Sequence, residues 1–510
     1  MRRPQLAIKT SFCMVPREAV KAIRYWPVQH PAASTARSER WKLLRGPGRA
    51  RLASNGGQRS RAEEPVLKRT LRDAAREDWP YCLLAAAVLA HLGMMGSLFW
   101  GYLDTWFDNS HSLQQGIDFF SVYEAGHNAL ENRSVYYFDA ADTSITPHHN
   151  PFRYLPSVAY VLAVPMNALS AWPAYWGWVS LNELLLVVNA YLTWQVAGRG
   201  KWGLIAASMW FAFTPFYVEQ YVGQFSFLMA TFTLLLGIGL VRGRQLSGGV
   251  PWAISIITKS NSALLLPVLV RFGWWKPIAI AGALLALNIP YYLARWRDFE
   301  YFLWINVGQG FDLGFLDYEL RLGEMRFFVD VDHRLFTFSS GELGLTALLR
   351  NSFLAIDSAA TSLPGGVSPA LIGIIVAVGL AATFMSKRPD KLALFGLWIL
   401  TFFLVYGAWE HHYVMLLPVL ALLVALRPAS RPLALVVFTM IALPSPYWLI
   451  NAVSDATLPA GGLLSIQESW PVWGVIVHHM AKPLPVVALW AHLVYTQVWS
   501  DKGLKMDSRL

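Results

Sequence analysis

Long apolar segments alternate with short polar loops along most of the chain. The first clear segment is "PYCLLAAAVLAHLGMMGSLFWGYL", and the apolar segments together cover 80–103, 153–169, 173–197, 202–218, 225–241, 248–271, 277–293, 367–385, 392–408, 413–427, 432–449 and 471–499. A helix needs about 20 apolar residues to cross roughly 30 Å of hydrocarbon. The pattern therefore predicts an all-α polytopic membrane protein with about 11 to 12 transmembrane helices.

Two of these segments are interrupted, which leaves two topologies open. Segment 153–169 contains Pro156 and Pro165, and segment 248–271 is broken at the polar run "TKSNS". In the first topology, 153–169 lies along the outer surface and 248–271 forms a hairpin of two half-spans. In the second, each of the two segments crosses the membrane once.

The basic loops favour the first topology. Lys and Arg concentrate in five short runs between apolar segments, at 198–201, 242–244, 271–276, 386–391 and 427–432. Loops rich in Lys and Arg stay in the cytoplasm, and only the first topology keeps all five there. Both topologies nevertheless put the same three parts on the outer face: the first outer loop 104–150, the loop 294–366 and the "WEHH" segment at 409–412.

Composition supports a membrane protein and separates the N-terminal tail from the rest. Only 15% of residues are charged and 55% are hydrophobic, with a mean hydropathy of +0.38, whereas soluble domains carry about 25% charged residues. Residues 1–79 hold 18 of the 42 Lys and Arg and 7 of the 32 Asp and Glu, a net charge of +11, so the remainder carries −1. We expect this tail to be mostly disordered and cytoplasmic; nucleic-acid binding is a weaker alternative.

The pattern divides the chain into four parts. After the tail 1–79 comes a core membrane module at 80–293, which contains the first outer loop and its continuation, 104–172. An extracytoplasmic loop follows at 294–366, and a C-terminal transmembrane module occupies 367–510. We expect a multi-pass protein of a bacterial inner or plasma membrane, with both termini in the cytoplasm.

The first outer loop contains the stretch "DFFSVYEAGHNAL", which begins at Asp118. Its apolar residues recur at helical spacing, so it is expected to form an amphipathic helix on the outer leaflet. An Asp at the start of a helix commonly caps the helix. Residue type alone therefore favours a capping role for Asp118.

Other polar residues stand out against the apolar background. Lys259 lies in the middle of "IITKSNSALLLP", where a lone charge is costly unless it meets an anion or water; snorkelling to a span end is the alternative. Arg153 precedes "YLP" at the outer interface. Three His pairs occur, at 148–149, 411–412 and 478–479. Adjacent His residues on a helix point about 100° apart, so no single pair is expected to chelate a metal ion.

Four stretches in this order resemble glycosyltransferase family 87, a family of multi-pass GT-C enzymes that includes polyprenol-phosphate-mannose-dependent α-1,2-mannosyltransferases. The first combines Asp118-Phe119, Tyr123, Ala125-Gly126, Tyr136 and "FRYLP"; the others are "YVGQFSFLM", "AISIITKSNSALLLP" and "WEHHYVMLLP". The family usually has Asn where this chain has Ser226, and Pro after the position of Lys259. These departures bear on substrate identity more than on reaction class.

The resemblance implies a GT-C fold and the inverting transfer of a sugar, preferentially mannose, from a polyprenyl-phosphate donor to an acceptor hydroxyl at the outer face. By this resemblance Asp118 is the general base, and one of His411 and His412, preferentially His411, donates a hydrogen bond to the acceptor or to the phosphate. Lys259 and Arg153 are expected to bind the donor phosphate, and interfacial anchoring is the alternative for Arg153. The residues expected to line the acceptor and donor sites are Tyr123, Glu124, Tyr154, Gln224 and Glu410.

The expected partners are a polyprenyl-phosphate sugar and a lipid or glycan acceptor, with no nucleic acid, cofactor or metal ion. Arabinofuranose or an aminosugar on the same carrier would make similar demands on a phosphate site. The alternative function is a transporter or flippase of a lipid-linked sugar. Such a protein is expected to spread polar residues over several spans near the bilayer midplane, whereas Lys259 is essentially the one such residue in this sequence.

Overall fold

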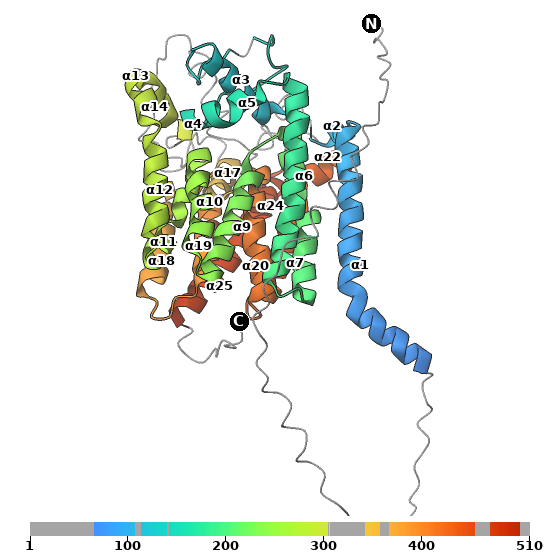
Figure 1. Cartoon of the computed structure of the whole chain (residues 1–510). Coiled ribbons are helices and arrows are strands. Elements are labelled where there is room, and N and C mark those ends of the chain that lie inside the picture. Colours follow the sequence, from blue (N-terminus) through green and yellow to red (C-terminus); the bar gives the residue numbers. More distant parts are fainter. Residues whose placement is uncertain are drawn as a thin grey trace, which may run out of the picture. The chain divides into compact units, whose positions relative to one another are not determined.

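The computed structural model describes residues 66–107, 114–139, 142–303, 305–306, 342–356, 367–453 and 470–499. Within these ranges the chain is helical, and extended pairing is limited to a single bridge between Glu342 and Trp409. Figure 1 shows a bundle of helices with a smaller helical layer around α3 at one end. The all-α fold predicted from the apolar pattern is confirmed.

Three helical stretches are long and apolar enough to cross a membrane. They are Asp78–Phe99 within α1 (Val66–Phe99), Trp275–Ala294, which joins α12 (Trp275–Ala286) to α13 (Ile289–Ala294), and α18 (Val367–Met385). A fourth is the pair α24 (Val472–Met480) and α25 (Pro483–Trp499), which are bent by 43°. The chain is therefore a multi-pass membrane protein, and the total of 11 to 12 spans stays a prediction.

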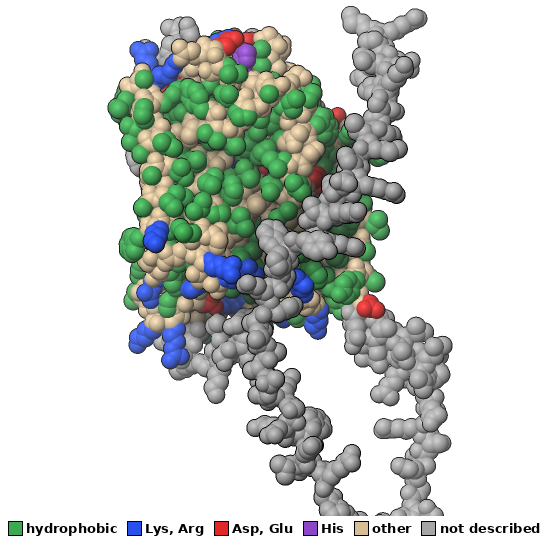
Figure 2. Space-filling view, viewed as in Figure 1, with side chains coloured by type: hydrophobic (Ala, Val, Ile, Leu, Met, Phe, Trp, Pro, Cys, Tyr) green, Lys and Arg blue, Asp and Glu red, His purple; other side chains and the backbone are tan. Residues whose placement is uncertain are grey.

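Further helices complete the bundle. They are α6 (Ala171–Val196), α7 (Lys201–Phe211), α8 (Thr214–Val222), α9 (Ser226–Arg242), α10 (Gln245–Thr258), α11 (Leu266–Arg271), α17 (Leu345–Ile356), α19 (Lys391–Val405), α20 (Leu417–Leu426) and α21 (Arg431–Ala442). Apolar side chains face outward over the middle of the bundle (Figure 2). A protein in lipid needs such a belt, because its outer surface contacts hydrocarbon and must be apolar there, as its interior is.

Basic loops that are far apart in sequence meet at one end of the bundle. The Arg431 guanidinium lies 4.0 Å from the ring centre of Trp202, and Arg271 donates a 3.0 Å hydrogen bond to the carbonyl of Ser386. In Figure 2 the larger group of visible Lys and Arg side chains lies at the lower end, opposite α3, and a smaller group lies at the upper end. The structure therefore has a basic end and an opposite end that carries α3.

Segment 248–271 enters the bundle and turns back. Helix α10 stops at Thr258, the 3₁₀ turn η3 (Ser260–Leu265) follows, and α11 returns. A Cβ added to Gly249, near the start of α10, would lie 2.1 Å from Pro277 Cγ at the start of α12. Helix α12 directly follows α11, so the start of α10 lies beside the end of α11. The hairpin therefore begins and ends at the same depth in the bundle. This is the hairpin of the first topology, with Lys259 at its tip.

The other interrupted segment packs against α3 (Ile117–Leu130). It forms α4 (Pro156–Val158), the π-helical turn η2 (Ala159–Ala163) and α5 (Val164–Met166). A Cβ on Gly126 of α3 would lie 2.5 Å from the backbone carbon of Ala163. This close approach covers α3, most of whose side chains are buried, so the helix forms where predicted but is enclosed by protein instead of resting one face on the leaflet.

Two parts of the predicted domain organisation lie largely outside the described residues, namely the tail up to residue 65 and most of the loop 294–366. The helix α1 begins at Val66, so the last part of the predicted tail is helical. In the loop, α14 (Trp296–Leu303) and α17 are described.

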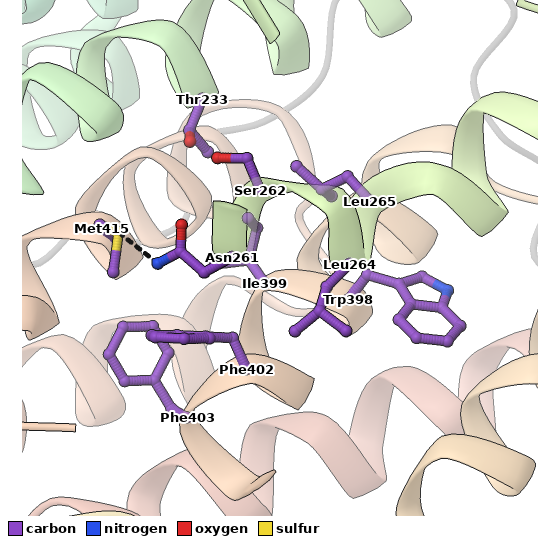
Figure 3. Close-up of a pocket in the computed structure, with 10 residues that line it drawn as sticks. All are labelled: Thr233, Asn261, Ser262, Leu264, Leu265, Trp398, Ile399, Phe402, Phe403 and Met415. Atoms are coloured by element: carbon purple, nitrogen blue, oxygen red, sulfur yellow. Dashed lines mark hydrogen bonds between the residues drawn. The ribbon is translucent and has the colours of Figure 1, made fainter. Parts of the chain in front are cut away.

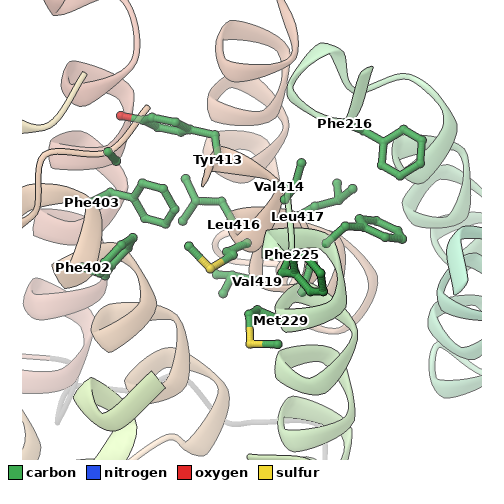
Figure 4. Packing of buried hydrophobic residues seen from close by; sticks show 14 of the residues in the cluster. Phe216, Phe225, Met229, Phe402, Phe403, Tyr413, Val414, Leu416, Leu417 and Val419 are labelled. Atoms are coloured by element: carbon green, nitrogen blue, oxygen red, sulfur yellow. The ribbon is translucent and has the colours of Figure 1, made fainter. Parts of the chain in front are cut away.

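The interior is densely packed around the "WEHH" segment, which forms the 3₁₀ element η7 (Glu410–Leu416). Figure 4 shows Phe402 and Phe403 of α19 beside Tyr413 and Leu416 of this element. The rings of Phe403 and Tyr413 are 4.7 Å apart, and the Tyr413 hydroxyl donates a 2.7 Å hydrogen bond to the Leu343 carbonyl. Buried aromatic contacts of this kind fix the path of an otherwise irregular segment.

Candidate functional site

Asp118 is the second residue of α3, and both of its carboxylate oxygens accept hydrogen bonds from amides. Asn150 Nδ2 donates to Oδ1 at 3.1 Å, and Gln224 Nε2 donates to Oδ2 at 3.1 Å. The N-cap of α3 is Gly116, in the left-handed conformation with φ +77°, and it makes no side-chain cap. The carboxylate of Asp118 is therefore committed to groups from other parts of the chain and does not cap its own helix.

Burial raises the pKa of Asp118 above its ordinary value. The hydrogen bond from Asn150, the positive charges of Arg153 and Lys259 and the hydrogen bond from Gln224 all act in the opposite direction. The carboxylate therefore combines partial desolvation, which makes it a better base, with donors and cations that favour its ionised form.

Gln224 joins Asp118 to the next part of the site. Its Oε1 accepts a 2.9 Å hydrogen bond from the Phe225 amide and a second hydrogen bond from the Tyr154 hydroxyl. These two donors fix the orientation of the amide, so that its NH₂ group faces Asp118. Gly223, with φ +70°, makes the turn before it, and a Cβ there would lie 2.5 Å from the Cβ of Phe119. The tight turn lets α3 approach the α8–α9 loop.

Lys259 reaches the N-terminus of α9 from the tip of the hairpin. Its ammonium donates a 2.7 Å hydrogen bond to Ser226 Oγ, and Ser226 is the first residue of that helix. The side chain is half-buried in the protein interior, so it is held there by a specific partner. A helix N-terminus carries partial positive charge, which together with Lys259 favours negative charge at this point, and the nearby Glu219 carboxylate supplies part of it.

Sequence reasoning missed Glu219, a fully buried carboxylate of α8. Its Oε1 accepts a 2.7 Å hydrogen bond from the Phe227 amide, one residue beyond Ser226. Glu219 and Lys259 attract each other electrostatically across this helix start. The available signal was a lone carboxylate in the apolar run "TPFYVEQYV", where an unpaired charge is expensive.

Arg153 and Tyr154 lie beside this group. The Tyr154 side chain is buried and bonds to Gln224, whereas Arg153 is exposed and its carbonyl accepts a 2.9 Å hydrogen bond from Asn306 Nδ2. The charge of Arg153 acts on both Asp118 and Lys259. Two cationic side chains thus act on the carboxylate, the half-buried Lys259 and the exposed Arg153.

The two His residues of η7 approach the site from another direction. Their rings are 4.2 Å apart, and both feel the charge of Lys259. His412 Nδ1 accepts a 3.0 Å hydrogen bond from the Trp409 amide, which leaves its proton on Nε2. His411 is buried, and its Nε2 has no hydrogen-bond partner among the described residues. The structure therefore brings His411, His412, Lys259 and Asp118 into one electrostatic neighbourhood.

Three other predicted lining residues have contacts of their own away from this group. Glu410 is buried and forms a 3.2 Å ion pair with Lys482. The Tyr123 hydroxyl donates a 2.7 Å hydrogen bond to the Leu169 carbonyl. Glu124 accepts a 3.4 Å hydrogen bond from Thr146 in the outer loop. A lining role for these three side chains stays a prediction.

A small cavity is lined in part by residues that follow Lys259 in the hairpin (Figure 3). It has a volume of about 20 Å³, enough for one water molecule. Asn261 and Ser262 of the hairpin form one wall, and Phe402, Phe403 and Met415 form another. Asn261 Nδ2 lies 3.6 Å from the Met415 sulfur, which links the hairpin to η7. Across the described ranges, no three His, Cys, Asp or Glu side chains are grouped to hold a metal ion.

Residues 152–313 match the model of glycosyltransferase family 87. This stretch contains Arg153, Tyr154, Gln224, Glu219 and Lys259, and so covers the half of the site built from α8, α9 and the hairpin. No curated protein matches the chain.

Proposed function

We propose that this chain, whose residues 152–313 match the model of glycosyltransferase family 87, is a membrane glycosyltransferase with the following reaction. It transfers a sugar, preferentially mannose, from a polyprenyl-phosphate donor to an acceptor hydroxyl, with inversion at the anomeric carbon. Asp118 is the general base. The transfer takes place at the extracytoplasmic face of the membrane.

The observation that carries this proposal is the arrangement around Asp118. A carboxylate held by two neutral amides lies within the field of two cations, Lys259 and Arg153. An inverting transfer requires a base on one side of the anomeric carbon and stabilisation of an anionic leaving group on the other. The acceptor oxygen attacks the anomeric carbon, its proton passes to Asp118, and the bond from the carbon to the phosphate oxygen breaks as polyprenyl phosphate leaves.

The start of α9 suits the leaving phosphate. The Lys259 ammonium lies at this helix N-terminus, where backbone dipoles favour negative charge. Arg153 supplies a second cation, and its planar guanidinium is well shaped to bind phosphate. His411 and His412 face the same neighbourhood from η7 and supply neutral hydrogen-bonding nitrogens to the phosphate or the acceptor.

The sidedness of the reaction is supported by charge. More of the visible Lys and Arg side chains lie at the end of the bundle opposite α3 than at the end that carries it (Figures 1 and 2). The positive-inside rule assigns that end to the cytoplasm, which assigns Asp118 and α3 to the extracytoplasmic face. A polyprenyl-phosphate donor fits this location, because its lipid tail remains in the bilayer while its head group meets the site.

Replacing Asp118 with Asn tests the proposal. The change keeps shape and one hydrogen-bonding oxygen but removes the base, so transfer of labelled mannose from polyprenyl phosphate is expected to fall by about 10²- to 10⁴-fold. The thermal melting curve in detergent is expected to stay close to that of the wild type. Asp142→Asn, in the same outer loop, is the control and is expected to retain activity.

Full activity of Asp118→Asn would exclude the catalytic role. A transporter or flippase of a lipid-linked sugar, the alternative function, predicts movement of the lipid-linked sugar between leaflets with no new glycosidic bond. A panel of polyprenyl-phosphate sugars, including arabinofuranose and an aminosugar, assigns the donor.

A further inference from the structure

The end of the first outer loop is tied to the start of α3 by side-chain contacts. His148 Nε2 donates a 2.8 Å hydrogen bond to the Gln115 carbonyl, and the His148 ring meets Phe120 edge-on at 5.5 Å. The Asn150 amide donates a 2.9 Å hydrogen bond to Ser121 Oγ. The contacted residues precede and follow Asp118 in the sequence. The loop is therefore fixed to the first turn of α3, which carries the carboxylate.

Asn150 also reaches the carboxylate directly. Its side-chain NH₂ donates a hydrogen bond to Asp118 Oδ1, while the side-chain NH₂ of Gln224 donates one to Oδ2. Each oxygen therefore has one neutral donor and keeps a lone pair for another hydrogen bond. A neutral amide orients a carboxylate and favours its ionised form without cancelling its charge, in contrast to a Lys or Arg partner.

The two donors come from different sides of the site. Gln224 is fixed by Tyr154 and the α8–α9 loop, on the side of the family 87 domain that carries Lys259. Asn150 belongs to the first outer loop, which precedes the matched residues. Among the described residues, the charged and titratable groups that act on Asp118 or are acted on by it are Arg153, Tyr154, Glu219 and Lys259. Asn150 is thus the contribution of the outer loop to the immediate surroundings of the base.

We propose that Asn150 is a positioning residue for Asp118, holding the carboxylate so that its free lone pair points at the acceptor hydroxyl. This inference rests on the proposed function, in which Asp118 takes the proton of that hydroxyl. His148 and the Asn150 backbone keep the loop in place, and the Asn150 side chain sets the direction of Oδ1. The role is separate from substrate binding, because Asn150 acts through Asp118.

The test compares three variants in purified full-length protein with polyprenyl-phosphate mannose as the donor. Asn150→Ala removes the donor to Oδ1, so kcat is expected to fall about tenfold to a hundredfold, with the acceptor KM within about twofold of wild type. The acid limb of the pH profile of kcat/KM is expected to move to higher pH by about one unit, because a carboxylate that loses a hydrogen bond is harder to ionise.

His148→Ala is the matched control, since it loosens the same loop without removing a donor to Asp118. Its acid limb is expected to coincide with that of the wild type. Asn150→Asp has nearly the same shape and places a second carboxyl beside Asp118, so its acid limb is expected to move further than that of Asn150→Ala. This variant decides the question if Asn150→Ala does not fold.

An acid limb unchanged in both Asn150 variants would overturn the inference, as would an equal shift in His148→Ala. Asp118→Asn, assayed in parallel, separates the two proposals. If Asp118→Asn is inactive and the Asn150 variants behave as wild type, only the positioning role fails. If Asp118→Asn is fully active, the base assignment fails, and the positioning role fails with it.

Discussion

At the scale of single residues, the outer loop contains a carboxylate whose ionisation differs from that of an ordinary Glu. Burial raises the pKa of Glu124 to about 7, and the negative charge of Asp142 adds to the effect. The hydrogen bond from Thr146 acts in the opposite direction. Glu124 lies on the same helix as Asp118, so its charge state is coupled to the packing of the outer loop on α3.

This carboxylate predicts a pH dependence of stability. The pKa of Glu124 is raised from 4.5 to about 7 on folding, so its contribution is fully present below pH 4.5 and is lost as the pH rises through 7. Glu124→Gln removes the titration, and the variant is expected to melt at a higher temperature than the wild type at pH 8. Thermal melts between pH 4.5 and 8 measure this difference.

The control for this prediction is Glu131→Gln, at the end of the same helix, where the side chain is exposed. This variant is expected to follow the wild-type pH dependence. A Glu124→Gln variant that tracks the wild type across the whole pH range would contradict the raised pKa.

At the scale of elements, a buried ion pair attaches η7 to the C-terminal helices. Glu410 pairs with Lys482 at 3.2 Å and accepts a 3.1 Å hydrogen bond from the Ser445 amide. The Lys482 ammonium also donates a 2.7 Å hydrogen bond to the Ile441 carbonyl. The C-terminal helices thus fix the position of Glu410, the first residue of η7. The next residue is His411, so the same contacts position His411 at the candidate site.

Breaking this pair is expected to destabilise the protein strongly. Glu410→Met or Lys482→Met leaves one charge buried without its partner, which costs about 3–5 kcal/mol. The double variant Glu410→Met with Lys482→Met removes both charges and is expected to recover much of that loss. Thermal melts of the single and double variants form a cycle that measures the coupling.

If the loss of stability in the double variant equals the sum of the losses in the two single variants, Glu410 and Lys482 are not coupled. Transfer activity provides a second readout: the single variants are expected to lose kcat through misplacement of His411, and the double variant to regain part of it.

At the scale of the whole molecule, the site is assembled from elements that are distant in sequence. Asp118 comes from the outer layer, Gln224 and Glu219 from the α8–α9 region, Lys259 from the hairpin and His411 from the C-terminal module. All of them depend on the hairpin entering from the basic end and on α3 lying at the opposite end. The sidedness of the bundle is therefore the property on which the proposed location of the reaction depends.

Cysteine labelling tests this sidedness. In a variant whose two natural cysteines, Cys13 and Cys82, are replaced by Ala, Arg133→Cys near the end of α3 is expected to react with a membrane-impermeant maleimide added outside intact cells. Arg244→Cys, at the basic end, is expected to react only after the membrane is permeabilised. Labelling of both positions from the same side would contradict the assignment of the reaction to the outer face.

The sequence by itself determined the class of the fold and several components of the site. Apolar runs of span length force helices, because hydrocarbon leaves no other partner for backbone N–H and C=O groups. Polar residues in such runs stand out for the same reason, which is how Lys259 and the "WEHH" segment were found. The order of the motifs pointed to the family that matches residues 152–313.

Only the tertiary structure decided how these components meet. In the sequence, only the charge of two loops favours the hairpin topology over the crossing topology. In the structure, the close approach of Gly249 to Pro277 shows that segment 248–271 turns back as a hairpin. The partner of Glu410 lies 72 residues further along the chain in Lys482, and the partner of Asp118 in Asn150 lies in an irregular loop. Periodicity describes which face of a helix is apolar, but it holds no information on which polar groups a fold brings together across distant segments. That pairing is set by packing, and packing made α3 a buried helix with its carboxylate directed into the site.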